Sequence, residues 1–587
     1  MRIPRMAYTL VLLFAALGAA RADDLKLKII ALNDLHGNLQ SPGKFRAKGK
    51  SPNVDAGGID YLAGYVAQLK RENPNHVVVA AGDLIGASAL VSALFHDEDT
   101  VEALNRVGLE FSSVGNHEFD KGKRELLRMQ SGGCSTEDQN TCQGAASGTP
   151  VPFEGAKFHY LAANVFDTAA HRTLFPAYAI KNYEGVRVAF IGLTLRETPT
   201  IVTPSGVAGL RFDDEASTIN AVIQRLRKQG VANFVVLIHQ GGRQTPAGTL
   251  DINACEGDLA GTPIESIVRR LDDHVDLVIS GHTHQPYICQ LPNRAGRKIY
   301  VTSASAYGRV LTDIDVRIDR NTRRVTDVSA KNILVERTTA SGVIPDATLK
   351  SLVDHYAALA APIANRVVGS VTAEISRTPN FAGEAALGDV IADAQLAATQ
   401  AAGSGGAVVS FMNEGGIRAD IPYVPVSPAA ENGAKKGEVT YNELFTVQPF
   451  GNSLVTMTLT GAQIKILLEE QFKGCSLGAP SNAVAPPETD RPLQVSDGFT
   501  YTWSPGGAVC AKVDAGSIKI HRAAVEPSAK YRVTVNSFLA DGGDQFWILQ
   551  QGTVRLGGPQ DIDAMLSYFE KHQPLAPGDP HRITVEP

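Results

Sequence analysis

Five short apolar runs, each followed directly by polar residues, constrain the fold of this chain more than any other feature. They comprise residues 27–32, 76–81, 111–114, 234–238 and 276–280. Continuous aliphatic and β-branched runs of this length are typical of strands buried on both faces. Helical patterns follow several of them, at residues 58–71, 99–107, 212–229 and 263–271. This alternation predicts an α/β domain.

The residues that follow these runs are metal-ligand types. In chain order they are Asp34, His36, Asp83, Asn116, His117, His239, His282 and His284. In an extended chain, residues two apart point to the same side, so each Asp-x-His or His-x-His pair can aim at one point. A lone histidine is more often structural. Because ligands gather beyond the carboxyl ends of strands, we expect this whole set to meet there.

Carboxylate, imidazole and amide ligands favour divalent transition metals over calcium or a thiolate site. The set is large enough for two ions that share one carboxylate. Two such ions about 3.5–4 Å apart can hold a hydroxide and clamp a phosphate for in-line displacement. His117 is then free to protonate the leaving oxygen or to stabilise charge on the phosphate, and Asp120 can orient it.

Composition narrows the class of protein. The 587 residues exceed one ordinary core, so at least two domains are expected. A net charge of −6 argues against a broad nucleic-acid surface, but it allows a small anionic substrate held by metals and a few arginines. The six cysteines suggest three local disulfides, Cys134–Cys142, Cys255–Cys289 and Cys475–Cys510. Fifteen connectivities remain possible, and without a Cys-x-x-Cys motif structural zinc is not expected.

The N-terminus has the pattern of a cleavable export signal, residues 1–22. Arg2 and Arg5 precede the short apolar segment 7–20, and Ala20 and Ala22 stand where a signal peptidase reads small residues. We therefore expect a periplasmic or secreted protein with no stable membrane insertion after cleavage. An uncleaved anchor is the alternative.

Together the five segments resemble the signature of the calcineurin-type metallophosphoesterases: Asp-x-His, Gly-Asp, Gly-Asn-His-Glu/Asp, His and Gly-His-x-His. The resemblance implies two divalent metal ions, of Mn, Zn, Co or Mg. One ion would be held by Asp34, His36, Asp83 and His284, and the other by Asp83, Asn116, His239 and His282. It also implies that Asp83 bridges the ions and that His117 and Asp120 form a catalytic dyad.

The C-terminal half resembles the substrate-binding domain of the 5′-nucleotidase branch. Residues 413–418 (NEGGIR), 448–452 (QPFGN) and 538–544 (FLADGGD) carry this resemblance. It implies that Phe450 and Phe538 sandwich a base, that Asp544 accepts bonds from the ribose hydroxyls, that Arg418 binds phosphate and that Asn413 adds a polar contact. Ordinary core packing of the two phenylalanines is the alternative.

One arginine departs from the family pattern. Animal relatives place a phosphate-contacting arginine shortly before the first helix of this domain, near a position that is Phe381 here. Arg377 lies slightly earlier and is our candidate for that role. A solvated surface arginine is the alternative reading.

The expected layout is a signal peptide at 1–22, a metallophosphoesterase β-sandwich flanked by helices at 23–344, a linker helix at 345–365 and an α/β substrate-binding domain at 366–587. By resemblance to the 5′-nucleotidase family, which includes bacterial periplasmic 5′-nucleotidase/UDP-sugar hydrolases, we expect hydrolysis of nucleoside 5′-monophosphates. ADP, ATP, UDP-sugars and NAD are further candidates.

Two other functions stay open. One is a 2′,3′-cyclic-nucleotide 2′-phosphodiesterase/3′-nucleotidase, although that branch usually has Asn-Tyr-Gly where this chain has residues 120–122 (DKG). The other is a non-catalytic nucleotide-binding surface protein. The sequence leaves the preferred base, the metal and the oligomeric state open.

Overall fold

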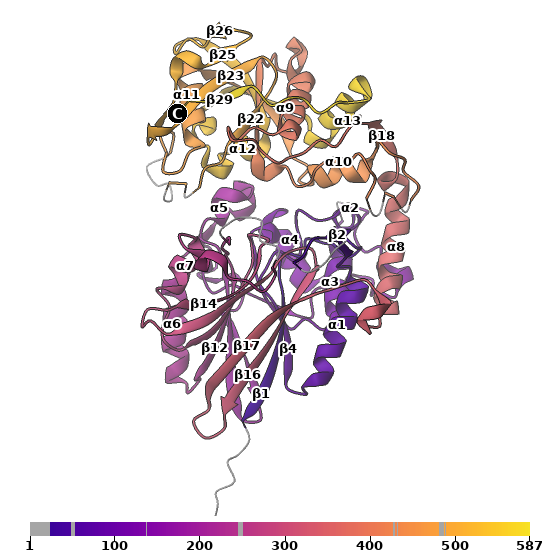
Figure 1. The fold of residues 1–587 in the computed structure, drawn as a ribbon, viewed down its shortest axis with the longest axis vertical. Helices are drawn as coiled ribbons and strands as arrows, with labels where there is room; N and C mark the ends of the chain where they lie inside the picture. Colours follow the sequence, from indigo (N-terminus) through magenta and orange to yellow (C-terminus); the bar gives the residue numbers. More distant parts are fainter. Residues whose placement is uncertain are drawn as a thin grey trace, which may run out of the picture.

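The computed structural model describes residues 24–586, except 49–52, 137, 245–250, 427–428, 431, 480–485 and 488. The expected export signal lies outside the described residues. Two bodies are stacked along the long axis, and helix α8 (Ala347–Ala364) runs beside the junction (Figure 1). Within the described residues, no helix has both the length and the apolar character needed to span a bilayer.

The first body contains two six-stranded sheets in the described part of the chain. The first has the order β17-β16-β1-β4-β5-β6 and the second β14-β15-β13-β12-β10-β9. Bounds in the first sheet are β1 Leu25–Leu32, β4 His76–Ala80, β5 Phe111–Ser113, β6 His159–Leu161, β16 Val310–Asp319 and β17 Arg324–Leu334. Those in the second are β9 Tyr178–Tyr183, β10 Val186–Thr194, β12 Asn233–His239, β13 Val275–Ser280, β14 Pro286–Pro292 and β15 Lys298–Ala304.

The five apolar runs form β1, β4, β5, β12 and β13, which confirms the predicted strands. Three of these strands lie in the first sheet and two in the second. Where two of the five are adjacent, as β1 with β4, β4 with β5 and β12 with β13, they run parallel. The inner faces of the sheets pack on each other through residues such as Ile29, Val77 and Leu237. All runs are buried on both faces because helices cover the outer sides.

Those helices make the body a four-layer sandwich (Figure 1). On the first sheet lie α1 (Ile59–Glu72), α3 (Glu98–Val107) and α4 (Gly122–Ser131), which share an apolar core with it. On the second lie α6 (Glu215–Lys228) and α7 (Pro263–Val268). The predicted β-sandwich flanked by helices is confirmed.

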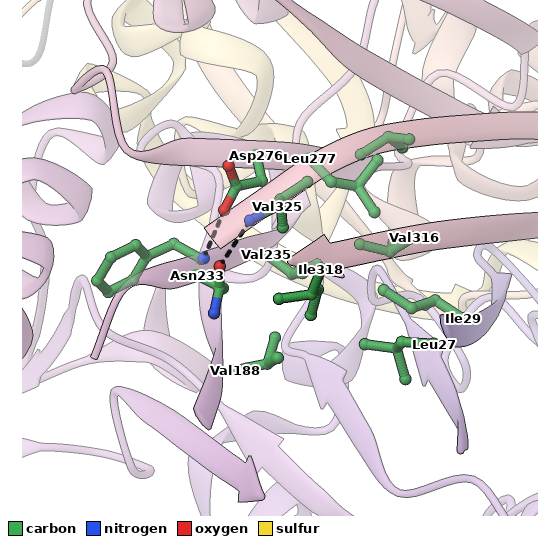
Figure 2. A pocket seen from close by; sticks show the side chains of 12 residues that line it. Leu27, Ile29, Val188, Asn233, Val235, Asp276, Leu277, Val316, Ile318 and Val325 are labelled. Carbon is green, nitrogen blue, oxygen red and sulfur yellow. Dashed lines mark hydrogen bonds between the residues drawn. The ribbon is translucent and has the colours of Figure 1, made fainter. Parts of the chain in front are cut away.

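Polar side chains cap one end of the core between the sheets (Figure 2). Asp276 accepts a hydrogen bond from the Phe234 amide at 3.1 Å, and Asn233 accepts one from the Val325 amide at 3.0 Å. A void of about 10 Å³ lies beside them. Burial raises the pKa of Asp276 to about 6, since water no longer solvates its charged form.

The second body is built on a five-stranded sheet, β22-β19-β27-β21-β28. Its strands are β22 Leu493–Val495, β19 Val409–Asn413, β27 Lys530–Asn536, β21 Ser453–Thr460 and β28 Thr553–Gln560. Its longest helices within the described residues are α9 (Ala386–Thr399), α11 (Gly461–Glu470) and α13 (Asp561–His572). A smaller sheet around β23 (Phe499–Ala508) packs into the same core as α11.

Helix α8 belongs structurally to the first body. The Asp346 side chain caps it by accepting bonds from the Thr348 and Leu349 amides. Leu349, Leu352 and Tyr356 are buried in the core of the first sheet. The chain therefore passes to the second body only after the helix ends, just before β18 (Val367–Ser370).

The cysteines pair as predicted, and all six lie within the described residues. Cys134–Cys142 closes a short loop after α4. Cys255–Cys289 ties the long segment after β12 to β14, and Cys475–Cys510 ties the end of α11 to the β23 region. Of the three, Cys255–Cys289 anchors an irregular segment directly to a strand.

Candidate active site

The predicted metal ligands gather beyond the carboxyl ends of β1, β4, β5, β12 and β13. Six form two clusters, Asp34 with His36 and His284, and Asp83 with His239 and His282; within each, the possible ligand atoms lie within 4.8 Å of one another. Neither cluster is local in the sequence. The junction between the two sheets therefore creates the site.

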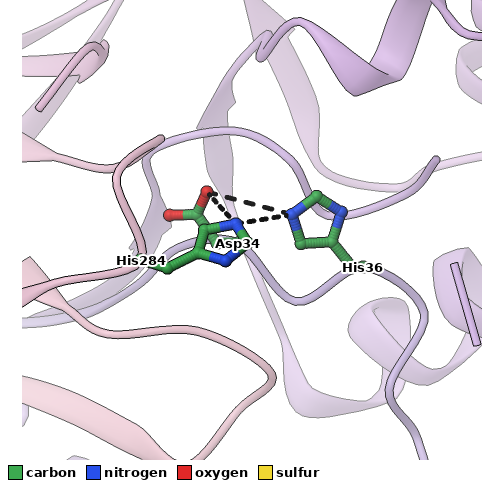
Figure 3. A group of neighbouring side chains, drawn as sticks. All are labelled: Asp34, His36 and His284. Carbon is green, nitrogen blue, oxygen red and sulfur yellow. Dashed lines mark hydrogen bonds and ion pairs between the residues drawn. The ribbon is translucent and has the colours of Figure 1, made fainter. Parts of the chain in front are cut away.

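In the first cluster, three side chains converge from two loops (Figure 3). The Nε2 atoms of His36 and His284 are 3.1 Å apart, and Asp34 Oδ1 lies 3.5 Å from His284 Nε2. Asp83 Oδ2 is 3.7 Å from His36 Nε2. Two imidazole nitrogens and two carboxylates aimed at one point form a donor set that fits a divalent transition metal.

The second cluster includes the predicted amide ligand. His239 Nε2 lies 2.9 Å from Asp83 Oδ2 and 3.2 Å from Asn116 Oδ1. His282 Nδ1 lies 3.1 Å from the same Asn116 oxygen. Because Asp83 faces both clusters, it occupies the place of a bridging ligand.

Backbone contacts fix the orientation of these side chains. His36 Nδ1 donates to the Gly86 carbonyl at 2.8 Å, and His239 Nδ1 donates to the Ala81 carbonyl at 2.7 Å. In the neutral imidazole, each bond places the proton on Nδ1 and turns Nε2 toward the site, as a metal ligand requires. Burial lowers the pKa of His36 and of His282 to about 3, which keeps both imidazoles neutral.

The ligand backbones are strained. Among the described residues, these ligands have left-handed φ values: Asp34 at 51°, His36 at 48°, Asp83 at 50°, His282 at 71° and His284 at 58°. Such conformations are costly for residues with a Cβ, and they persist where the surrounding structure enforces them, often at functional sites. Side-chain position, rather than backbone preference, decides the geometry here.

His117 and Asp120 form the predicted pair beside the clusters. His117 Nδ1 lies 2.9 Å from Asp120 Oδ2, which also accepts from the Ala87 amide at 2.9 Å. Burial acts to lower the pKa of His117, but the charges of Asp120 and Asp83 outweigh it and raise the pKa above its ordinary value. The imidazole is therefore stabilised as a proton donor.

Glu118 has a structural role that the sequence analysis did not assign. It is buried, and its carboxylate accepts from the amides of Asp83 at 2.9 Å, Leu84 at 2.8 Å and Gly115 at 2.6 Å. It thus joins the loops after β4 and β5. Its place in the Gly-Asn-His-Glu motif was the only signal, and no spacing pointed to its partners.

A cleft of about 660 Å³ opens in front of the clusters, between the two bodies. His117 and Asp120 line one wall. The other wall carries every predicted substrate residue: Arg377, Asn413, Arg418, Phe450, Phe538 and Asp544. The volume falls within the usual range for small-molecule sites.

Phe450 reaches across the cleft to the predicted dyad. Its ring stacks on His117 with centroids 5.8 Å apart and planes 20° apart. The Arg418 guanidinium lies 5.8 Å from the centroid of the Phe450 ring. The second body therefore places an aromatic ring and a positive charge directly beside His117.

Asp544 and Asn413 form a partly buried polar pair in the wall formed by the second body. Asn413 Nδ2 donates to Asp544 Oδ2 at 2.8 Å, and Asn536 donates to Asn413 Oδ1 at 3.0 Å. Asn413 therefore orients the Asp544 carboxylate through this hydrogen bond. Arg377 is exposed at the rim, donates to the Ile417 carbonyl at 3.0 Å and lies on the cleft wall, whereas Phe381 is 83% exposed.

Comparisons with known proteins identify the family of each body. The calcineurin-like phosphoesterase family matches residues 27–286, and the 5′-nucleotidase C-terminal domain matches residues 367–551. The chain is 30% identical to cell wall protein Lmo0130 of Listeria monocytogenes over 576 residues, covering 94% of this chain and 68% of that protein. It is 31% identical to endonuclease YhcR of Bacillus subtilis over 95% of its own length but only 41% of that protein.

Among solved structures, the chain resembles the 5′-nucleotidase precursor of Thermus thermophilus. The TM-score is 0.73 at 24% identity, covering 96% of this chain and all of that one. At this identity, the likeness establishes the shared two-domain fold.

Proposed function

Because the chain belongs to the 5′-nucleotidase family, which joins a calcineurin-like phosphoesterase domain to a 5′-nucleotidase C-terminal domain, we propose that it is an exported nucleotidase that hydrolyses nucleoside 5′-monophosphates to nucleoside and phosphate. One observation carries the proposal. Metal-ligand clusters, a His–Asp pair, two phenylalanines and an arginine all line one cleft. Each part of a nucleotide has a chemical counterpart there.

The metal-ligand clusters define the reacting end. Asp34, His36, Asp83 and His284 would hold one divalent ion, and Asp83, Asn116, His239 and His282 the other. Such ions polarise a phosphate ester and activate water when they are bound. The two clusters share Asp83, so the protein fixes both positions with one buried carboxylate.

The protein's own residues act on the phosphate and on the leaving group. His117, with its raised pKa, donates a proton to the leaving ester oxygen, and Asp120 holds the imidazole through Nδ1. Arg418 offers two parallel N–H groups to phosphate oxygens. Phe450 and Phe538 stack on the base, Asp544 accepts from the ribose hydroxyls and Arg377 adds positive charge at the rim.

The test uses the mature chain from residue 23, stripped with chelator and reloaded with Mn, Zn, Co or Mg. Phosphate release is measured from AMP, ADP, UDP-glucose and 2′,3′-cyclic AMP, for the wild type and His117→Ala. We expect metal-dependent turnover of AMP, reduced about 10²–10⁴-fold in the variant. Turnover of the cyclic substrate alone would indicate the phosphodiesterase branch. No turnover with any metal would leave a nucleotide-binding protein.

A further inference from the structure

Arg243 is a charged residue of the cleft to which the proposed mechanism gives no role. It follows β12 and lines the cleft from the first body, beside His282 and Thr283. Its side chain is exposed, and it makes no hydrogen bond or ion pair with another described residue. On the wall that carries the metal ligands, the cleft thus contains a guanidinium with no ionic partner among the residues that the structure describes.

The backbone on both sides of Arg243 is fixed. The Gly242 carbonyl accepts from Thr283 Oγ1 at 2.8 Å. The buried Gln244 side chain donates to the Pro286 carbonyl at 2.8 Å and accepts from the Glu256 amide at 2.8 Å. A Cβ at Gly241 would lie 2.2 Å from the Gly281 carbonyl oxygen, so the chain must approach the ligand loop closely.

A disulfide extends this restraint. Cys255 precedes Glu256, whose amide binds Gln244, and Cys255 is bonded to Cys289 on β14. The described residues Cys255 and Glu256 are therefore tied to β14 and to Gln244, the neighbour of Arg243.

Arg243 and Arg418 lie at different parts of the ligand set. Arg418 comes from the second body and lies over Phe450, on the side of His117. Arg243 comes from the first body and flanks His282. His282 belongs to the second metal-ligand cluster, whereas His36 and His284 belong to the first. A single phosphate beside His117 has Arg418 as its guanidinium partner, which leaves Arg243 for another anionic group.

We propose that Arg243 binds a second phosphate group of the substrate, attached to the one that is cleaved, and so favours nucleotides with a phosphoanhydride over monophosphates. This rests on the proposed nucleotidase function and names a residue that sets its specificity. A guanidinium presents two parallel donors that match phosphate oxygens, and such charge-assisted bonds are the stronger kind.

The experiment compares wild type, Arg243→Ala, Arg243→Lys and the control Arg71→Ala in the full, metal-loaded chain. Arg71 is an exposed arginine of the same domain, at the end of α1. Values of kcat/KM are measured for AMP, ADP, UDP-glucose and adenosine 3′,5′-bisphosphate. For Arg243→Ala we expect a loss of about ten- to a hundredfold with ADP and UDP-glucose, and a change below about threefold with AMP. Arg243→Lys should recover part of the loss.

In adenosine 3′,5′-bisphosphate the second phosphate is attached to the other side of the ribose and not to the cleaved phosphate. The loss in Arg243→Ala should therefore be as small with this bisphosphate as with AMP. Equal losses with AMP and ADP, or a loss confined to the bisphosphate, would overturn the proposal. Calorimetric binding of α,β-methylene-ADP and AMP gives a second measure, in which Arg243→Ala should weaken only the diphosphate. If the wild type does not turn over AMP, the nucleotidase function fails, while the binding ratio still decides the role of Arg243.

Discussion

At the scale of single residues, two backbone groups connect the metal-ligand clusters to the His–Asp pair. Gly86 accepts from His36 Nδ1 through its carbonyl, and the next amide, that of Ala87, donates to Asp120. A Cβ at Gly86 would lie 2.0 Å from the His117 carbonyl oxygen. This dipeptide therefore positions one ligand and one member of the dyad at once.

We expect Gly86→Ala to lower both metal affinity and turnover, each by at least about tenfold, because the added methyl group displaces rigid backbone. Metal content after dialysis and kcat with AMP are the measurements. Gly43→Ala is the matched control, since Gly43 has a similar φ of 86° but nothing within 4 Å of its Cβ position. If Gly86→Ala keeps its metal and its rate, the dipeptide is not a coupling element.

Asp276 gives a prediction about stability. Its folded pKa of about 6 exceeds the unfolded value of about 3.9, so the folded state binds the extra proton. The stabilising contribution is present below pH 4 and is lost as the pH rises through 6, which costs on the order of 3 kcal/mol at neutral pH. Asp276→Asn removes this dependence.

The variant should therefore gain stability relative to the wild type between pH 4 and pH 7. Urea unfolding of both proteins in chelator, at matched pH values, measures the difference and cancels the titration of other groups. A difference that stays constant with pH would show that Asp276 titrates normally in the folded protein.

At the scale of elements, the disulfide Cys255–Cys289 should matter for both stability and specificity. It spans 34 residues, against 8 for Cys134–Cys142, and a cross-link over a longer loop restricts the unfolded chain more. We expect Cys255→Ser/Cys289→Ser to lose about 2–4 kcal/mol, more than the corresponding pair at Cys134 and Cys142. Calorimetry measures the stability, and the ADP-to-AMP ratio of kcat/KM should fall in the first pair only.

The sequence predicted where strands lie and where they end better than it predicted which strands pair with one another. Apolar runs identified β1, β4, β5, β12 and β13 because burial on both faces leaves a direct mark in composition. The same runs carry no information about pairing, so the division into two sheets entered only through the family resemblance. Likewise, β16 pairs with β1 although the two strands are far apart in the sequence. Lys28 of β1, for example, donates a hydrogen bond to Asp313 of β16, which lies 285 positions later.

The predicted site shows the same limit. Ligand types and spacing could be read from the residues after each strand, but Glu118 acts through backbone amides that no pattern reveals. From the sequence, helix α8 is predicted to be a linker between the two domains. Its Leu349 and Tyr356 are instead buried in the core of the first body, because its apolar stripe needs a surface to cover.

At the scale of the whole molecule, the two bodies divide the residues of the proposed site between them. The first carries the metal ligands, the second carries the phenylalanines, and they meet where Phe450 stacks on His117. We expect Phe450→Ala/Phe538→Ala to lower kcat/KM for AMP by about ten- to a hundredfold, since base stacking is worth about 1–3 kcal/mol.

Hydrolysis of glycerol phosphate, which has no base, should change little in the same variant. Phe381→Ala is the control, because Phe381 is a highly exposed phenylalanine of the same body. An equal loss with glycerol phosphate would mean that Phe450 acts through His117 and not through the base.

The contribution of ligands by both sheets has a consequence for the sandwich itself. Asp34 follows β1 of one sheet, whereas His282 and His284 follow β13 of the other. An ion held by Asp34 and His284 would act as a reversible cross-link between the two sheets. It would close some 250 intervening residues into a ring whose ends cannot separate while the ion stays bound. Chelation would then open that ring, and resistance to heat and to proteases would follow the supply of metal in the surroundings.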